Sequence, residues 1–172
     1  MKLFHVSENP GIAVFTPKPS PQNYDNIKGN AVFAINDKML HNYLLPRDCP
    51  RVTFYAGENS SNDDVKIFMG TSKCKYHIYT EVDWLEKIKN TTLYLYEFPD
   101  TDFELLDDNA GYYVSYNEVK PVKKITIHDP LNEFKKRNAV LMLSNDLRKL
   151  AEEVSNSSLQ FSIIRLRNAK HN

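Results

Sequence analysis

The segment MKLFHVSENPGIAVFTPKPSPQ (1–22) contains the first strand pattern of the chain and the loop that follows it. KLFHV (2–6) is a short apolar stretch that includes one histidine, His5, with Ser7 two residues after it. The next residues cannot continue as a helix, because they include Pro10, Pro17, Pro19 and Pro21. A strand that ends in a breaker-rich loop is therefore the first unit of the fold, and the same pattern recurs along the chain.

Short runs rich in β-branched and aromatic residues, bounded by Gly, Pro, Asn or Asp, predict strands. They lie at 2–6, 31–35, 51–56, 65–70, 74–80, 92–98, 111–116, 123–128, 139–143 and 159–166. Helices are expected at 36–45, 81–90, 129–138 and 144–156. The helices are too irregularly spaced for repeated βαβ units, so we expect an α+β fold with mixed, largely antiparallel sheets and peripheral helices.

Two of the expected helices have clear start signals. Asp129 is a good N-cap residue, and Pro130 follows it at the first helical position. The helix at 144–156 has an apolar row at i, i+3, i+4 and i+7, formed by Leu147, Leu150, Ala151 and Val154. We expect residues 1–172 to form a single domain, in which 129–172 could fold as a small β-α-β appendage.

Composition excludes several classes of protein. The 172 residues include 22 Lys+Arg and 22 Asp+Glu, so the basic excess of a nucleic-acid-binding protein is missing. The basic clusters KPVKK (120–124) and FKKRN (134–138) are interpreted as solvated surface. No run of about 18 apolar residues predicts a membrane span, and the start of the chain lacks a signal-peptide pattern. We expect a soluble, cytoplasmic protein with no membrane partner and an unknown oligomeric state.

The two cysteines and five histidines do not have the spacing of a metal site. Cys49 and Cys74 form no CxxC motif, so both are expected to be free thiols in a reducing compartment. The phosphate-loop, dinucleotide, zinc-protease and serine-hydrolase motifs are also absent. We therefore expect no metal.

His5 and Ser7 are the first candidate site residues. Strand alternation places both on one face of the sheet. The imidazole could bond a ribose hydroxyl or a phosphate, with Ser7 as a second polar group and loop 8–22 as a cover. The alternative is a half-buried strand histidine bonded to a backbone carbonyl.

Arg47 is the second candidate, in the stretch HNYLLPRDCPRV (41–52). Two prolines bracket it and stiffen the turn. A guanidinium held on a rigid turn suits a phosphate, because its fork bonds two oxygens at once. Local pairing of Arg47 with Asp48, or capping of a helix end, explains the residue equally well.

The stretch DDNAGYYVSYNEVKPV (107–122) supplies the third group of candidates. Tyr113 and Ser115 share one strand face, and the tyrosine could stack on a base; ordinary cross-strand packing is the alternative. Glu118 is a candidate catalytic carboxylate or a solvated turn residue. The polar loops 17–30 and 57–64 are candidate lids.

Several of these blocks resemble a bacterial family known only as a domain of unknown function. The likeness rests on LFHVSENPGI, AVFAI, NYLLPRDCPRV, YLYEFP, AGYYVS and LQFSIIRLRNA, and it covers nearly the whole chain. This family implies no established activity.

A second resemblance implies a function. The order of LFHVS, a proline-rich loop, AVFAI and a short helix, followed later by YLYEFP and YYVS, is similar to ADP-ribosyltransferase-like and RNA 2′-phosphotransferase-like folds. It implies a cleft between small sheets that binds NAD, with His5 on the adenosine ribose and Tyr43 or Tyr55 beside the nicotinamide. The family's glutamate activates the ribose. Tyr113 or Val114 stands at its position here, and Glu118 is offset by several residues.

We thus expect a protein that binds NAD or a related nucleotide through His5, Ser7 and Arg47, with Tyr43, Tyr55, Tyr113 and Ser115 at the ring or ribose. Whether it is an enzyme is open, with Glu118 as the one candidate catalytic residue. The alternative is a non-catalytic binding or interaction module with a degenerate cleft.

Overall fold

A computed structural model describes residues 1–20 and 27–171 of the chain. The chain divides into two compact units, each built from two separate stretches of sequence. Unit 1 comprises Met1–Tyr43 and Thr92–His128, and unit 2 comprises Leu44–Thr91 and Asp129–Asn172. Residues 129–172, considered above as an appendage, belong with residues 44–91 in unit 2.

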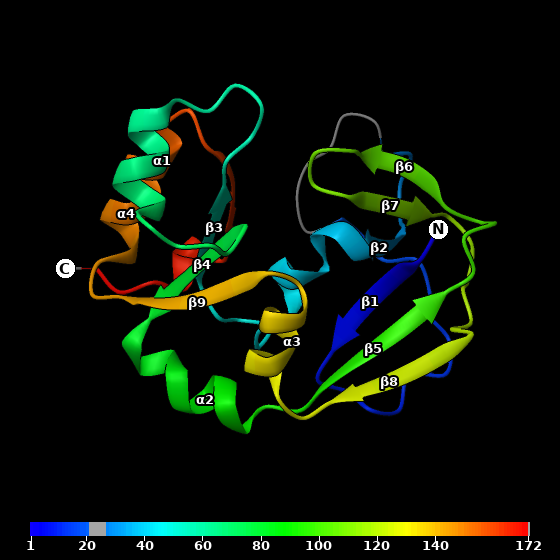
Figure 1. Cartoon of the computed structure of the whole chain (residues 1–172). Helices are drawn as coiled ribbons and strands as arrows, with labels where there is room; N and C mark the ends of the chain where they lie inside the picture. The colour runs from blue at the N-terminus through cyan, green and yellow to red at the C-terminus, as the bar shows by residue number, and fades with distance from the viewer. Residues whose placement is uncertain (21–26, 172) are drawn as a thin grey trace. The chain divides into compact units, whose positions relative to one another are not determined.

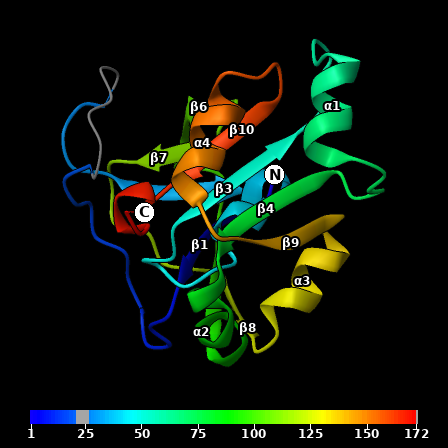
Figure 2. The same ribbon diagram turned by 90° about the vertical axis from the view of Figure 1, so that its left-hand side faces the viewer.

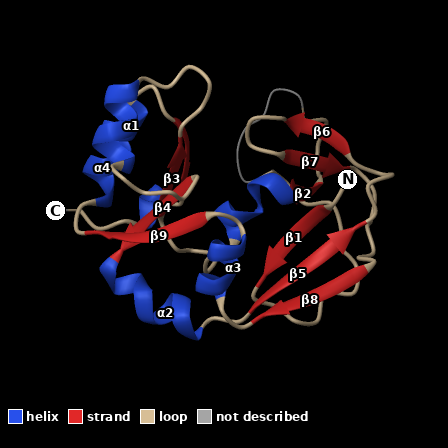
Figure 3. Cartoon of the chain, viewed as in Figure 1, coloured by secondary structure: helices blue, strands red, loops and turns tan. Residues whose placement is uncertain are grey.

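Unit 1 is a six-stranded antiparallel sheet in the order β6-β7-β2-β1-β5-β8 (Figures 1 and 3). Its elements are β1 (Leu3–Ser7), β2 (Val32–Asn36), the 3₁₀ helix η1 (Asp37–Tyr43), β5 (Leu93–Phe98), β6 (Glu104–Asp107), β7 (Tyr112–Ser115) and β8 (Lys123–Ile127). One face of the sheet holds a core of Leu3, Phe15, Val32, Ala34, Tyr96, Phe98 and Val119.

Unit 2 is a four-stranded sheet in the order β10-β3-β4-β9, in which only β4 and β9 are parallel. Its elements are β3 (Arg51–Tyr55), α1 (Asn62–Met69), β4 (Tyr76–Glu81), η2 (Val82–Trp84), α2 (Leu85–Asn90), α3 (Pro130–Lys136), β9 (Ala139–Ser144), α4 (Leu147–Ser155), β10 (Gln160–Ile164) and η3 (Leu166–Asn168). Figure 2 shows α4 beside β3 and β4. Its apolar row packs with Val52 and Phe54 of β3 in the core of this unit.

The α+β class and the mostly antiparallel pairing are confirmed. The expected helices at 129–138 and 144–156 are present as α3 and α4, with Asp129 and Asp146 as N-caps. The expected helix at 36–45 is the 3₁₀ helix η1.

The strand expected at 65–70 is wrong, because residues 65–69 belong to α1. The Ser61 side chain accepts a hydrogen bond from the backbone N–H of Asp64, and Asp63 and Asp64 lie in the first turn, where acidic side chains favour a helix. Gly70 ends the helix at a φ of 56° and a ψ of −127°, a conformation that glycine adopts at little cost. Of the four apolar residues in VKIFM, Val65, Phe68 and Met69 pack against the unit 2 core and Ile67 is 72% exposed, a spacing that fits a helix and not a strand. The candidate lid 57–64 therefore ends in the first turn of a helix. Of the other candidate lid, 17–30, residues 21–26 lie outside the described part of the chain.

Candidate functional site

His5 lies in the middle of the unit 1 sheet, half-buried on the face that carries the core. Its Cα lies opposite that of Tyr96 in β5, and its ring centroid is 4.8 Å from that of Phe15. Its Nδ1 is 3.3 Å from the backbone oxygen of Phe33. A carbonyl oxygen only accepts, so this hydrogen bond requires Nδ1–H to donate and leaves Nε2 as the acceptor nitrogen of the neutral ring. The hydrogen bond to a backbone carbonyl, which the structural interpretation of His5 predicts, is therefore present. It also sets a tautomer of the ring that can accept a hydrogen bond from a hydroxyl group.

The two candidate serines both bond to the turns that follow their strands. The Ser7 hydroxyl accepts from the backbone N–H of Asn9 at 3.1 Å, and the Ser115 hydroxyl accepts from that of Asn117 at 3.3 Å. Ser115 is buried, whereas Ser7 is partly exposed. Each hydroxyl therefore has a local role in shaping a turn, and its role toward a ligand stays a prediction.

The tyrosines of unit 1 lie on opposite faces of the sheet. Tyr113 lies opposite Ala34 and packs against the core on the His5 face. Tyr112, the neighbouring residue, points the other way, and its hydroxyl is hydrogen-bonded to that of Tyr43. The structure therefore brings Tyr113 to the face of His5 and pairs Tyr43 with Tyr112 on the other face.

Glu118 is exposed and directly precedes Val119. The backbone of Val119 pairs with that of Phe15 through hydrogen bonds of 2.8 and 2.9 Å, and its side chain is part of the core. Neighbouring side chains of extended backbone point in opposite directions. Glu118 therefore points away from the core cluster that contains Phe15.

Arg47 and Tyr55 belong to unit 2, so the predicted site residues are divided between the two units. Arg47 is exposed in the turn closed by the hydrogen bond from Cys49 N–H to the Pro46 oxygen. The Tyr55 ring packs edge-on against Tyr76 at 5.1 Å, with the Lys75 ammonium 5.9 Å from its centroid. Burial, more than the neighbouring Tyr76, raises the pKa of Tyr55, so its hydroxyl stays protonated at neutral pH.

Cys49 is not poised as a nucleophile. It is buried, its Sγ is 3.2 Å from the Thr80 hydroxyl, and that hydroxyl donates to the Pro50 oxygen at 2.7 Å. Burial raises the pKa of the Cys49 thiol, which disfavours the reactive thiolate. Among the described residues, no cluster of His, Cys, Asp and Glu side chains could hold a metal ion.

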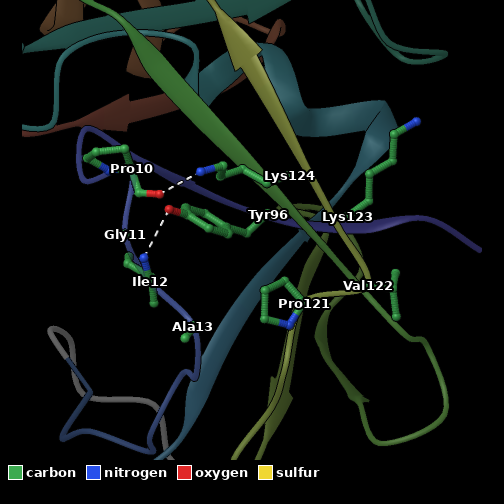
Figure 4. Close-up of a pocket in the computed structure, with 9 residues that line it drawn as sticks. All are labelled: Pro10, Gly11, Ile12, Ala13, Tyr96, Pro121, Val122, Lys123 and Lys124. Atoms are coloured by element: carbon green, nitrogen blue, oxygen red, sulfur yellow. Dashed lines mark hydrogen bonds between the residues drawn. The ribbon is translucent and has the colours of Figure 1, made fainter.

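Unit 1 contains an open pocket of about 410 Å³ (Figure 4). One wall is the backbone of 10–13, the other is 121–124, and Tyr96 lies between them. The Tyr96 hydroxyl donates to the Asn9 oxygen at 2.7 Å and accepts from the Ile12 N–H at 3.2 Å. The Lys124 ammonium donates to the Pro10 oxygen at 2.8 Å. These three hydrogen bonds hold the loop 9–12 against the sheet and so shape the pocket.

None of the eight residues predicted from sequence lines this pocket. Lys123 and Lys124, which do, belong to the KPVKK stretch that was interpreted as solvated surface. The sequence signal that could have pointed to Lys124 is the strand alternation of β8. In the structure Lys124 lies opposite Tyr96, and its ammonium is 5.7 Å from the centroid of the Tyr94 ring. A lysine on the same sheet face as two tyrosines indicates a possible binding site. The strand register that brings these three side chains together could not be derived from the sequence.

We expect Tyr96→Phe to lower the free energy of unfolding by about 1–3 kcal/mol, because it leaves the Asn9 carbonyl and the Ile12 N–H without their partner. Urea unfolding followed by circular dichroism measures this change. Tyr94→Phe is the matched control in the same strand, and it should change stability by less than about 0.5 kcal/mol. Equal effects of the two variants would mean that the Tyr96 hydroxyl does not hold the loop.

The comparison with known families matches residues 4–169, which span both units, to a family of unknown function, DUF6886. The chain belongs to the DUF6886 family. No curated protein and no solved structure matches it. Over residues 1–20 and 27–171, no helix has the length and apolar character needed to cross a bilayer.

Proposed function

We propose that this DUF6886 protein binds a nucleotide of the NAD class through unit 1. The observation that carries the proposal is the open pocket of Figure 4, where Lys124 brings its ammonium group to a concave surface beside Tyr96. Its volume of about 410 Å³ lies in the range of small-ligand sites. Pro10, Ile12 and Val122 offer apolar wall for a ribose or base, while the Lys124 ammonium complements phosphate charge.

The resemblance to ADP-ribosyltransferase-like folds, with their nucleotide cleft, adds His5 to this proposal. The imidazole of His5, whose Nδ1 is 3.3 Å from the Phe33 oxygen, suits a ribose hydroxyl. His5 does not line the pocket, but Phe15 packs against both His5 and Tyr96, at ring distances of 4.8 and 5.2 Å. The phosphate contact of Lys124 and the ribose contact of His5 are therefore separable parts of the proposal.

Binding without turnover is favoured over ribosyl transfer by the position of Glu118. An oxocarbenium-like transition state needs a carboxylate beside the reacting ribose. Glu118 points away from the cluster that includes Phe15, the ring packed against His5. We expect no release of nicotinamide when the protein is incubated with NAD. Release that Glu118→Gln abolishes would establish the transferase instead.

Isothermal titration with NAD, ADP-ribose and adenosine tests the binding proposal. We expect saturable binding of the two diphosphates and at least about tenfold weaker binding of adenosine, since about 1.4 kcal/mol of phosphate contact corresponds to a factor of ten in Kd. The variant Lys124→Gln should raise the Kd for ADP-ribose at least tenfold. Its matched control, Lys120→Gln, removes one exposed charge of unit 1 outside the pocket and should bind as the unmodified protein does.

His5→Gln tests the contact carried by the resemblance. Loss of affinity for ADP-ribose in this variant, with unchanged circular dichroism, supports the ribose contact. Unchanged affinity removes His5 from the site and leaves the lysine pocket. Absence of binding by the folded, unmodified protein to any of the three ligands overturns the proposed function.

A further inference from the structure

His77 is a buried histidine in the interior of unit 2. It belongs to β4, one of the two inner strands of the sheet, and is 3% exposed. Its ring stacks on that of Phe54, its partner in β3, with the ring centroids 5.6 Å apart and an angle of 25° between the planes. Phe54 in turn contacts the rings of Tyr79 and Phe68. The imidazole of His77 is therefore part of an aromatic cluster in the core of this unit.

The ring nitrogens of His77 lack the hydrogen bonds that buried polar groups ordinarily make. In the part of the chain that the structure describes, neither Nδ1 nor Nε2 has a partner at hydrogen-bond geometry. Burial lowers the pKa of His77, and this effect outweighs that of the Cys74 backbone, which favours the protonated ring. The interior of unit 2 therefore accepts the neutral imidazole and opposes its protonated form.

The described elements on this side of the sheet offer no counter-charge to a protonated ring. Their side chains in the core are apolar: Val52 and Phe54 of β3, Val65, Phe68 and Met69 of α1, and Leu147, Leu150, Ala151 and Val154 of α4. On β9, the residue opposite His77 is Val140. On β4 itself, Tyr79 and Glu81 share the face of His77. Burial raises the pKa of Tyr79, so its hydroxyl stays neutral, and Glu81 lies about 13 Å along the strand. The Glu81 carboxylate accepts a hydrogen bond from the Lys170 N–H at 2.7 Å.

The charged side chains of the neighbouring elements have other partners or lie in solvent. Asp64 of α1 accepts hydrogen bonds from the hydroxyl and the backbone N–H of Ser158. Arg148 of α4 donates to backbone oxygens in and after η3. Lys75, before β4, has its ammonium 5.1 Å from the centroid of the Tyr76 ring. The remaining charged residues of the two helices are exposed: Asp63, Lys66, Lys149, Glu152 and Glu153.

We propose that His77 makes unit 2 sensitive to mild acid, because the packed core holds the neutral imidazole and excludes the imidazolium. In the unfolded chain the ring lies in water and takes up a proton near its ordinary pKa of 6.5. In the folded unit a charged ring would be buried without an anion, and the attraction of the Phe54 ring for a cation offsets only part of that cost. The contribution of neutral His77 to stability is therefore complete above about pH 6.5, and it is lost as the pH falls below that value.

This effect is separable from other effects of acid. Hydrogen bonds from Ser158 lower the pKa of Asp64, so protonation of this carboxyl destabilises α1 only at more acidic pH. Of the five histidines of the sequence, two belong to unit 2, and the second of them, His171, is exposed. The proposal does not depend on nucleotide binding, because the pocket of Figure 4 belongs to unit 1.

Urea unfolding of the full chain at pH values between about 7.5 and 5 tests the proposal. Trp84, the single tryptophan of the sequence, belongs to unit 2, so its fluorescence reports on this unit. Across this range we expect the equilibrium constant for unfolding to rise about tenfold more in the unmodified protein than in His77→Phe or His77→Gln, because the unfolded chain alone takes up the proton. Phenylalanine keeps the ring stack and glutamine keeps a polar side chain, so a folding defect in one variant leaves the other for the comparison.

His171→Gln is the matched control, because it removes the exposed histidine of the same unit. It should keep the full pH dependence of the unmodified protein. The same pH dependence of unfolding in the unmodified protein and in every His77 variant that folds overturns the proposal. Loss of the pH dependence in His171→Gln also overturns it, since an exposed group would then take up the proton.

Discussion

Phe54→Ala is expected to lower the free energy of unfolding by about 3–5 kcal/mol, the range for removing a large aromatic side chain from a core. Phe54 is fully buried in β3 and belongs to the unit 2 core. Its ring stacks on Tyr79 at 5.5 Å and on His77 at 5.6 Å, and Phe68 of α1 meets it edge-on at 5.9 Å. Because three rings from two elements contact it, the surrounding structure cannot collapse easily into the cavity.

Phe161→Ala is the matched control, because Phe161 lies directly opposite Phe54 in the adjacent strand β10 but is 46% exposed. It should cost less than about 1 kcal/mol, since little apolar area returns to water. Chemical denaturation of both variants, followed by far-UV circular dichroism, measures the difference. Similar costs for the two phenylalanines would mean that the unit 2 core is not packed as the structure describes.

Gly111→Ala is expected to destabilise unit 1 by about 2–5 kcal/mol, from two causes that add. Gly111 has a φ of 69°, and a left-handed conformation costs a residue with a Cβ roughly 1–2 kcal/mol. The added Cβ would also lie 2.7 Å from Asn36 Oδ1 and 2.8 Å from Met39 Cγ, and such overpacking costs about 1–3 kcal/mol. The Asn36 side chain cannot move freely, because it accepts a hydrogen bond from the Met39 N–H at the start of η1.

Gly70→Ala separates the two causes. Gly70 also has a positive φ, of 56°, but a Cβ there would meet no atom within 4 Å. Its cost should therefore be the conformational one alone, about 1–3 kcal/mol for a φ of 56° with a ψ of −127°. Thermal and urea unfolding of both variants measure the two values. A Gly111→Ala variant no less stable than Gly70→Ala would show that the contacts with Asn36 and Met39 carry no strain.

The elements that sequence predicted well are those whose signals are local. Asp129 with Pro130 marks the start of α3, and the apolar row from Leu147 to Val154 marks α4, because caps and periodicity act within one or two turns of the chain. α1 was missed because its cap, Ser61, lies in a polar stretch that resembles a loop. Its C-terminal half, VKIFM, is apolar enough to resemble a strand. Packing of Val65 and Phe68 on the unit 2 core decides in favour of the helix.

At the candidate site, too, the sequence identified local features and missed those that depend on the tertiary structure. Sequence alone identified His5 as a strand histidine with two alternative roles, and the structure adds the Phe33 carbonyl that sets its tautomer. Sequence did not identify Lys124, because nothing local distinguishes it from other surface lysines. Only strand register places it opposite Tyr96 and within reach of the Pro10 carbonyl, more than a hundred residues away in the chain.

By itself the sequence determined the α+β class, most strand positions, the N-caps of α3 and α4 and membership of the DUF6886 family over residues 4–169. All of these depend on residue type and short spacing. The tertiary structure decided how the strands divide between two discontinuous units, which tyrosine shares the face of His5, and which lysines form a pocket. The physical reason is strand pairing: side chains alternate between faces, so one residue of register determines which distant groups meet, and no local pattern encodes that register.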